Sequence, residues 1–279
     1  MLDKVYLEIT NLCNLSCSFC HKTKRAARMM TAEEYDLLTG RLAGKVKYLY
    51  FHLMGEPTLH PLLPSFIAKA RERGFLPMLT TNGSLLEACG DALIADPLHK
   101  ISISIHAPEA NPEFADDSYI ETCARFARRA AAVGTVVALR LWNLGSDADN
   151  SETLARLHRA FPEPWKTARP GESERIAERI YLEWGARFDW PDIDAPARVD
   201  GAPTFCHALR NHCGVLVDGT VVPCCIDADG VMALGNLYEK ELEEILASPR
   251  AQAILRGFGE RHACEELCRR CGFAHQFDR

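Results

Sequence analysis

Apolar, β-rich runs alternate with helical segments over most of the first 185 residues of this 279-residue chain. The strand-like runs lie at 4–10, 46–53, 75–83, 100–107, 135–144 and 179–185. The first intervening helix begins with a capping box formed by Thr31 and Glu34. This alternation predicts parallel strands wrapped by helices, with right-handed crossovers. Six units are fewer than the eight of a closed barrel, so we expect a partial (β/α)6 TIM-like barrel over residues 1–190.

A second, smaller domain is expected over residues 191–279, where the pattern changes. Two alternating apolar runs flank Asp218 and Gly219, which is a strong β-hairpin signal. Two short helices should follow, the second of them capped by Ser248 with Pro249 at its first position. Residues 162–203 are rich in Pro, charge and Trp and contain the last barrel strand and a connector. The sequence therefore predicts an α/β barrel followed by a small hairpin-plus-helix domain.

Polar or unusual residues follow five of the expected strands. They are the cysteines after the first strand, "MGEP" after the second, "TTNG" after the third, "SIHA" on the fourth, and Arg140 with Asn143 on the fifth. The carboxyl ends of parallel strands share one edge, where α/β folds gather their active sites. We therefore expect these residues to meet at one rim.

Three cysteines stand in the loop after the first strand, at the spacing C-x-x-x-C-x-x-C. Cys13, Cys17 and Cys20 carry this pattern. Thiolates are soft ligands that favour iron–sulfur clusters and zinc. A cubane cluster usually takes four cysteines, so three without a nearby fourth leave one iron with an open position, where chemistry can occur. The alternatives are a zinc site completed by His21 or three unrelated thiols.

The composition excludes several classes of protein. No apolar run approaches the roughly 20 residues of a membrane helix, and no signal peptide precedes the first strand, so we expect a cytoplasmic protein without a membrane partner. In that reducing compartment clustered cysteines are metal ligands rather than disulfides. The net charge of −6 argues against nucleic-acid binding. The short basic run at 21–28 reads as a solvated loop or a phosphate contact.

The cysteine loop and the rim motifs together resemble the radical S-adenosylmethionine (SAM) superfamily, and the resemblance extends over most of residues 4–185. It implies a 4Fe–4S cluster whose open iron chelates SAM. An electron, supplied by a donor such as flavodoxin or ferredoxin, would cleave SAM to a 5′-deoxyadenosyl radical that takes a hydrogen atom from substrate. The chain enters its first strand within a few residues, so we expect no leader-binding module, which mildly weakens a peptide substrate.

The same resemblance implies which residues contact SAM. These residues are Phe19, Gly55, Glu56, Pro57, Asn82, Ser104 and Arg140. Phe19 would lie against the adenine, the Gly-Glu-Pro turn would hold the ammonium group, and Arg140 would pair with the carboxylate. Two positions depart from the family pattern, because Met54 replaces a usual Gly and His106 stands where Asp is frequent. For Asn82, Ser104 and Arg140 the alternatives are an ordinary turn, an interior hydroxyl and a surface charge.

The tail resembles the Twitch domain, the short form of the SPASM extension of some radical SAM enzymes. The matching residues are Cys206, Cys224, Cys268 and Cys271, which would hold a fully ligated auxiliary 4Fe–4S cluster. One alternative is a second open cluster, because Cys264 precedes Cys268 and Cys271 at the spacing of the front loop. Another alternative is a zinc ribbon.

Cys225 follows a presumed ligand at the end of a strand, where neighbouring side chains point to opposite faces. We expect Cys224 to face the auxiliary cluster and Cys225 to face the barrel mouth. A thiol there could return a hydrogen atom to the substrate radical, which predicts epimerisation of a peptide or small-molecule (sugar) carbon. The alternatives are a dehydrogenase that oxidises an alcohol or peptide through the auxiliary cluster, and a non-catalytic iron–sulfur or zinc protein. Cys89, Cys123 and Cys213 read as packing residues.

Overall fold

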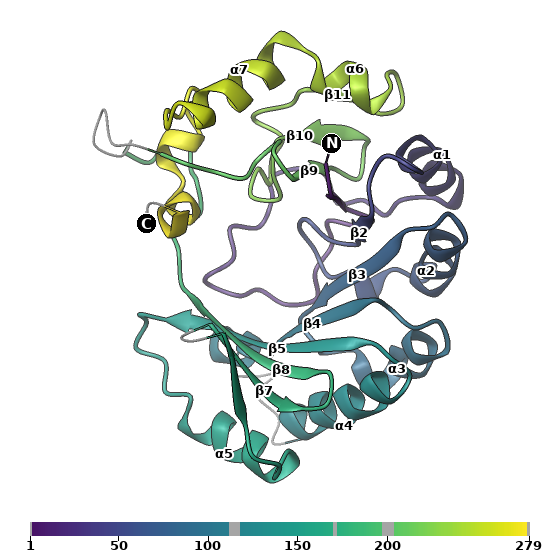
Figure 1. Ribbon diagram of the computed structural model, residues 1–279, viewed down its shortest axis with the longest axis vertical. Helices are drawn as coiled ribbons and strands as arrows, with labels where there is room; N and C mark the ends of the chain where they lie inside the picture. The colour runs from purple at the N-terminus through teal and green to yellow at the C-terminus, as the bar shows by residue number, and fades with distance from the viewer. Residues whose placement is uncertain (1, 112–117, 170–171, 197–203, 278–279) are drawn as a thin grey trace.

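The computed structural model describes residues 2–111, 118–169, 172–196 and 204–277, and its strands form one 11-stranded sheet (Figure 1). The order across the sheet is β11-β10-β9-β1-β2-β3-β4-β5-β8-β7-β6. The strands are β1 (Lys4–Leu7), β2 (Tyr48–Tyr50), β3 (Leu76–Thr81), β4 (Lys100–Ser104), β5 (Val136–Leu144), β6 (Lys166–Arg169), β7 (Ser173–Ala177), β8 (Ile180–Ala186), β9 (His212–Val215), β10 (Thr220–Val222) and β11 (Gly235–Asn236).

The six predicted barrel strands are confirmed as β1, β2, β3, β4, β5 and β8, and each pairs in parallel with the next. Helices lie between them in the chain: α1 (Ala32–Leu42), α2 (Leu63–Glu72), α3 (Leu86–Ala95), α4 (Tyr119–Ala132) and α5 (Ser151–Ala160). In Figure 1 helices α1 to α4 cover the outer side of the curved sheet. The capping box of Thr31 and Glu34 is confirmed at the start of α1. The fold is therefore a partial barrel with an open concave side.

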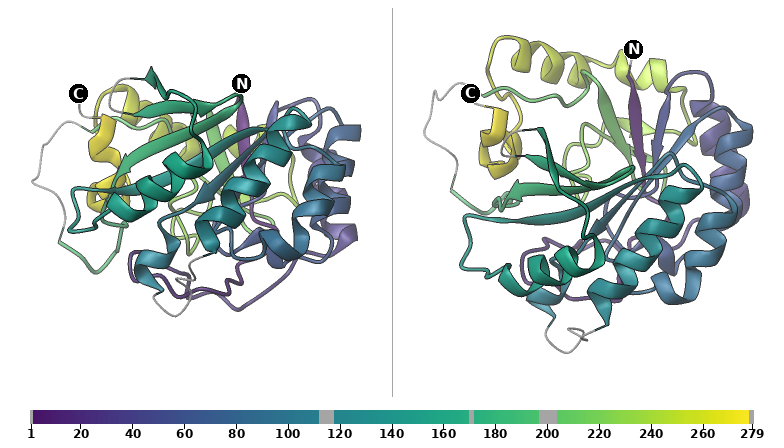
Figure 2. Two further views of the ribbon diagram at one scale, coloured as in Figure 1. Left: turned by 90° about the horizontal axis from the view of Figure 1, so that it is seen from below. Right: turned by 60° about the horizontal axis from the view of Figure 1, so that its bottom comes forward.

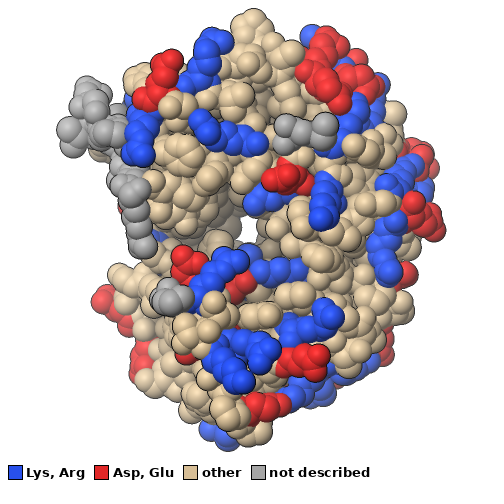
Figure 3. Space-filling view, in the orientation of Figure 1, with Lys and Arg blue, Asp and Glu red and all other residues tan. Residues whose placement is uncertain are grey.

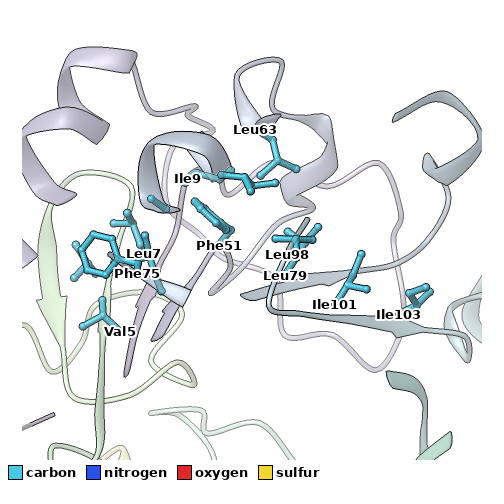
Figure 4. Packing of buried hydrophobic residues seen from close by; sticks show 14 of the residues in the cluster. Val5, Leu7, Ile9, Phe51, Leu63, Phe75, Leu79, Leu98, Ile101 and Ile103 are labelled. Atoms are coloured by element: carbon cyan, nitrogen blue, oxygen red, sulfur yellow. The ribbon is translucent and has the colours of Figure 1, made fainter. Parts of the chain in front are cut away.

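Successive side chains of the barrel strands point alternately to the two faces of the sheet. Val5 and Leu7 of β1 are buried in the same hydrophobic cluster as Ile101 and Ile103 of β4 (Figure 4). Phe51, just after β2, is buried there too and lies 6.2 Å from the Tyr35 ring of α1. Because successive side chains of a strand point to opposite faces, the residues between these apolar positions point to the concave face.

The C-terminal hairpin is confirmed, but it joins the barrel sheet directly. Strands β9 and β10 pair in antiparallel fashion, and β9 pairs in parallel with β1. The helices α6 (Leu242–Leu246) and α7 (Pro249–Gly259) follow, and Ser248 caps α7 as predicted by accepting a hydrogen bond from the Ala251 amide. Figure 2 shows this region closing over the edge of the barrel beside β1. The domain boundary at residue 190 stays a prediction.

The sequence did not predict the β6–β7 hairpin. It adds two antiparallel strands beyond β8 at the edge of the sheet. All four residues of β6 are exposed, so no apolar alternation marks the strand. Among the described residues, no helix has the length and apolarity that crossing a membrane requires.

Candidate active site

The three front cysteines lie in the long loop that follows β1, at the carboxyl end of the barrel strands. An isolated antiparallel bridge between Thr10 and Met29 closes this loop at its base. Cys13 is exposed, while Cys17 and Cys20 are half-buried. The Cys20 amide donates a hydrogen bond of 3.2 Å to the Cys17 carbonyl, which forms a tight turn between the last two thiols. The loop thus carries all three thiols at the predicted rim.

Amide groups donate to two of these sulfur atoms. The side-chain amide of Asn111 lies 3.0 Å from Cys17 Sγ, and the Leu15 backbone amide lies 3.5 Å from Cys13 Sγ. Hydrogen bonds to cysteine sulfurs are one of the means by which a protein tunes a cluster's reduction potential. Asn111, which is 1% exposed, was missed by the sequence reasoning. Its place just after the "SIHA" strand was the available signal.

The electrostatics of the loop fit a cationic cluster. Burial raises the pKa of the Cys13 and Cys20 thiols, and the neighbouring Cys17 raises both further. Three nearby thiolates repel one another unless positive charge lies between them. No group of His, Cys, Asp and Glu in the described residues is arranged around a single metal ion. In a cubane each thiolate binds its own iron atom, so the thiols need not converge on one point, and the donor set fits that group.

The zinc alternative has no support from His21. Its Nε2 atom lies 3.7 Å from an Asp229 carboxylate oxygen, and its ring stacks with Trp190 at 6.0 Å between centroids. The imidazole is therefore engaged with the C-terminal region.

The Gly-Glu-Pro turn packs directly beneath the cysteine loop. Gly55 has a φ of +76°, and a Cβ atom there would lie 2.5 Å from the Thr10 carbonyl oxygen. Glu56 is 2% exposed, and its amide donates a hydrogen bond of 2.7 Å to the Leu12 carbonyl. Only glycine fits this contact without displacing the loop.

The Glu56 carboxylate joins the second and third strand ends. It accepts hydrogen bonds from the Thr58 amide and hydroxyl, from the Thr81 hydroxyl at 2.8 Å and from the Asn82 amide at 2.7 Å. Burial raises the pKa of Glu56, and these donors oppose the rise. The carboxylate therefore fixes the "TTNG" turn next to the cysteine loop. Its predicted contact with the SAM ammonium group stays a prediction.

Asn82, Ser104 and Arg140 lie on adjacent strands of the same rim. The Asn82 side chain donates to Asn14 at 3.0 Å, within the cysteine loop. Ser104 pairs with Arg140 in the β4–β5 register. The Arg140 guanidinium lies 3.3 Å from Glu183 and stacks over the Trp142 ring at 4.7 Å, so its partner in this structure is a carboxylate of β8.

Phe19 and His106 meet on the other side of the loop, with their ring centroids 5.2 Å apart. The Arg187 guanidinium covers the Phe19 ring at 5.2 Å. His106 also contacts the Arg140 carbonyl through Nδ1 at 2.9 Å. His106 thus contacts both Phe19, the predicted neighbour of the adenine, and Arg140, the predicted partner of the SAM carboxylate.

The four predicted auxiliary ligands line one cavity. Its wall includes Cys206, Cys224, Cys268 and Cys271, together with apolar side chains such as Met232. Burial raises the pKa of Cys206, Cys224 and Cys268, and neighbouring thiols raise each of them further. Four thiols around one apolar cavity are the donor set of a fully ligated iron–sulfur cluster.

The remaining tail cysteines lie outside that cavity wall. Cys264 is exposed, although it precedes Cys268 at the spacing of the front loop. Cys213 is fully buried in the main core, as is Cys123 of the barrel helix α4, and burial raises the pKa of each thiol to about 12. Both behave as small apolar side chains.

Cys225 and Cys224 follow β10 (Thr220–Val222) and pack against different apolar clusters. Cys225 packs with Cys20 and Trp190 against a small apolar cluster between the barrel and the tail. Its thiol lies close to the side chain of Tyr6, a concave-face residue of β1. Burial raises the pKa of Cys225 to about 11. Cys224 lines the auxiliary cavity and Cys225 does not, while the direction of Cys225 toward the barrel mouth stays a prediction.

A clasp formed by Asp229 holds the cysteine loop to the tail, and the sequence reasoning missed it. One carboxylate oxygen accepts hydrogen bonds from the Thr23 hydroxyl at 2.7 Å and the Lys24 amide at 2.8 Å. The Arg25 side chain donates to the Ala228 carbonyl at 2.9 Å. These contacts join segments about 200 residues apart, which no local pattern signals.

An α/β partial barrel with three rim thiols and four more around a neighbouring cavity defines an iron–sulfur enzyme with an auxiliary cluster site. Family models match both parts: the radical SAM superfamily over residues 7–140, and SPASM, an iron–sulfur cluster-binding domain, over residues 206–272. The chain belongs to the radical SAM superfamily and carries a SPASM-type C-terminal domain. Its cofactors are SAM and the 4Fe–4S cluster that binds SAM, and iron–sulfur cluster binding by the C-terminal domain implies a further, auxiliary cluster there.

Curated relatives align with parts of the chain. One is the tungsten-containing aldehyde ferredoxin oxidoreductase cofactor-modifying protein of Pyrococcus furiosus, 37% identical over 29% of this chain and 24% of that protein. Another is a probable GTP 3′,8-cyclase of Pyrobaculum aerophilum, 27% identical over 66% of this chain and 60% of that protein. The chain spans less than two thirds of the length of either relative.

Solved structures match the fold over nearly the whole chain. BtrN in complex with AdoMet and 2-DOIA superposes with a TM-score of 0.59 at 20% identity, covering 97% of this chain and 93% of BtrN. The anSMEcpe structure with AdoMet and the Cp18Cys peptide gives a TM-score of 0.63 at 14% identity, covering 98% and 89%. At these identities the likeness concerns the fold alone.

Proposed function

We propose that this radical SAM enzyme epimerises a carbon centre of a peptide or small-molecule (sugar) substrate, with the Cys225 thiol as hydrogen donor. The observation that carries the proposal is the position of that thiol. The Cys225 thiol lies close to the Tyr6 side chain of the concave face, and Cys225 is not part of the cavity wall that Cys224 lines. One dipeptide therefore offers a thiol to each side of the interface between barrel and tail.

When bound, the reduced cluster and SAM supply a 5′-deoxyadenosyl radical that removes one hydrogen atom from the substrate carbon. Cys225 then gives the hydrogen atom of its S–H bond to the opposite face of that carbon, which forms the new C–H bond and leaves a thiyl radical on sulfur. One electron from a flavodoxin- or ferredoxin-type donor and one proton restore the thiol. The substrate gains and loses one hydrogen atom, so its composition is unchanged.

The surroundings of Cys225 favour the protonated form that this step needs. Burial raises the pKa of the thiol to about 11, so it stays S–H at neutral pH. Burial, and then the neighbouring Cys225, raise the pKa of Tyr6 well above its ordinary value. The Tyr6 hydroxyl therefore stays protonated beside the sulfur, and the proton that restores the thiol comes from solvent.

The second candidate is dehydrogenation of a substrate alcohol or peptide. It is favoured by the Lys100–Glu183–Arg140 network on the concave side, where Glu183 lies 2.6 Å from Lys100. Burial raises the pKa of Glu183, but the charges of Lys100 and Arg140 outweigh burial and hold it below the usual value. The ionised carboxylate can accept the proton that leaves when a substrate radical is oxidised.

Mass spectrometry of products formed in D2O separates the two reactions. Reconstituted enzyme is incubated anaerobically with SAM, reductant and a pool of polar metabolites and peptides. Epimerisation gives a product of unchanged composition that carries one deuterium, because the Cys225 thiol exchanges with solvent. Dehydrogenation gives a product lighter by two hydrogens.

The variant Cys225→Ala should still form 5′-deoxyadenosine but lose the deuterated product. Cys264→Ala is the matched control, because this cysteine is exposed and lies outside the auxiliary cavity wall. Normal inversion by Cys225→Ala refutes the donor role. Cluster binding by the wild type without 5′-deoxyadenosine would refute catalysis altogether.

A further inference from the structure

Two buried polar atoms on the concave face have no hydrogen-bond partner among the described residues. They are His52 Nδ1 and Thr80 Oγ1. Leaving a buried donor or acceptor unpaired is costly, and native structures usually satisfy such groups. Both residues are half-buried as a whole, although the two unpartnered atoms themselves have almost no exposed surface. Neither atom serves a contact within the described part of the fold.

The sheet register makes these two residues neighbours. Tyr50 of β2 pairs with Met78 of β3 in a parallel ladder. His52 and Thr80 each come two residues further along the chain, so they occupy the next row of the concave face. Asn82, a predicted SAM contact, comes two residues beyond Thr80. The row therefore lies one step deeper in the barrel than the SAM-binding rim.

The row also lies close to the predicted hydrogen donor. The Tyr6 ring meets His52 edge-on at 5.4 Å between centroids and lies 4.7 Å from the Tyr50 ring. Tyr6 is also a neighbour of the Cys225 thiol. A group bound at His52 and Thr80 would thus lie on the same concave face as the Tyr6 ring.

The chemistry of the row selects an uncharged hydroxyl group. Burial, together with the smaller effect of the Arg140 charge, lowers the pKa of His52 to about 3, so the imidazole is neutral. A neutral imidazole has one donor and one acceptor nitrogen, and the Thr80 hydroxyl can both donate and accept. A ligand ion would meet no opposite charge from these two residues, whereas a hydroxyl can bond to both.

The rest of the concave side suits a ligand with further polar substituents. A cavity of about 860 Å³ has a wall that includes Lys100, Trp142 and Glu183, although neither His52 nor Thr80 lines it. Figure 3 shows charged side chains of both signs around the central opening of the molecule. Aromatic surface combined with a few fixed polar groups is typical of a small-molecule site.

We propose that His52 and Thr80 form a hydroxyl-binding subsite and that the substrate is a hydroxyl-rich ring compound, of the sugar or cyclitol class, rather than a peptide. The inference deepens the proposed epimerisation, since the subsite would hold the substrate between the SAM-binding rim and Cys225. Its test uses binding, which does not depend on the fate of the thiol.

Binding is measured by anaerobic calorimetry on the reconstituted full chain with SAM present. The probes are myo-inositol, methyl α-D-glucoside and, as the contrasting ligand, N-acetyl-alanyl-alanine amide. We expect saturable binding of at least one polyol, and a dissociation constant raised about tenfold in Thr80→Val and in His52→Phe, as the loss of one hydrogen bond to a buried polar group implies. Thr167→Val is the matched control, because Thr167 is exposed on β6.

Thermal unfolding of the ligand-free protein separates binding from structure. Because the Thr80 hydroxyl has no partner in the described fold, Thr80→Val should leave the midpoint unchanged or raise it. A lowered midpoint with unchanged polyol affinity overturns the proposal, as does binding of the dipeptide amide without any polyol. Binding and inversion are measured separately, so a failed epimerisation by the wild type leaves the subsite standing and a failed binding assay does not touch the thiol.

Discussion

Replacing Gly55 by alanine should disrupt the contact between the Gly-Glu-Pro turn and the cysteine loop. The new Cβ would lie 2.5 Å from the Thr10 carbonyl oxygen and 2.7 Å from that of Leu12, both of which are backbone atoms. Gly44 offers a matched control. Its φ of +74° is close to the +76° of Gly55, but a Cβ there meets nothing within 4 Å.

Both substitutions place an alanine in a left-handed backbone conformation, but only Gly55→Ala also adds a steric clash. A left-handed backbone costs an alanine about 1–2 kcal/mol, partly offset by the reduced freedom of the unfolded chain, so Gly44→Ala should cost about 1 kcal/mol. Gly55→Ala adds about 1–3 kcal/mol for the forced shift and about 1 kcal/mol for the strained Glu56–Leu12 hydrogen bond. Its total is therefore about 3–5 kcal/mol, or roughly 10 °C in the unfolding midpoint.

Unfolding midpoints, iron content and the spectral response to SAM together test this reasoning. We expect Gly55→Ala to lose the SAM response while the auxiliary site keeps its iron, because the shift acts on the front loop. Gly44→Ala should keep both. Equal destabilisation of the two variants, or an intact SAM response in Gly55→Ala, would show that this close contact does not hold the loop.

Two further predictions concern the clasp and the concave face. Asp229→Ala should cost about 1–2 kcal/mol of folding stability, since two hydrogen bonds are lost at a partly exposed carboxylate. It should also alter the electron paramagnetic resonance spectrum of the SAM-binding cluster, whereas the exposed control Asp147→Ala should leave that spectrum unchanged. Identical spectra for Asp229→Ala and the wild type would show that the clasp does not position the cysteine loop. The folded-state pKa of His52, about 3, lies below its unfolded value near 6.5, so protons bind the unfolded chain preferentially and stability falls as pH drops below about 6.5. The loss should reach about 2 kcal/mol at pH 5, and His52→Phe should remove it, leaving the similar contribution of His212; a variant with the wild-type slope would contradict the assignment.

Local signals in the sequence predicted the elements that local physics builds. The capping box at Thr31, the hairpin at Asp218 and the cap at Ser248 each depend on a few adjacent residues, and all three are present. The six parallel strands were readable because their buried residues form continuous apolar runs. The rim was predictable too, since parallel strands place their carboxyl ends together.

Contacts between distant segments were not predictable. The pairing of β9 with β1 joins residues more than 200 positions apart, and neither strand carries a mark of its partner. The same holds for Asp229, which reads as one acidic residue in a turn until the fold sets it against Thr23. The place of His52 beside Thr80 was likewise not predictable, because it follows from the pairing of Tyr50 with Met78 rather than from a motif.

Glu8 shows how these distant segments become one site. The carboxylate is fully buried and accepts hydrogen bonds from the Arg25 guanidinium at 2.7 Å, the Met54 amide at 3.2 Å and the Val217 amide at 3.0 Å. These donors come from the cysteine loop, the approach to the Gly-Glu-Pro turn and the C-terminal hairpin.

A buried ion pair adds little net stability over an apolar replacement, but breaking it by removing one partner costs about 3–5 kcal/mol. A displaced hairpin would remove the Val217 donor, and a displaced cysteine loop would leave Glu8 without its cation. Each segment therefore holds the others in place through one charge. The barrel, the front loop and the auxiliary domain form a single cooperative unit around the reacting centre, although their sequence motifs read as separate modules.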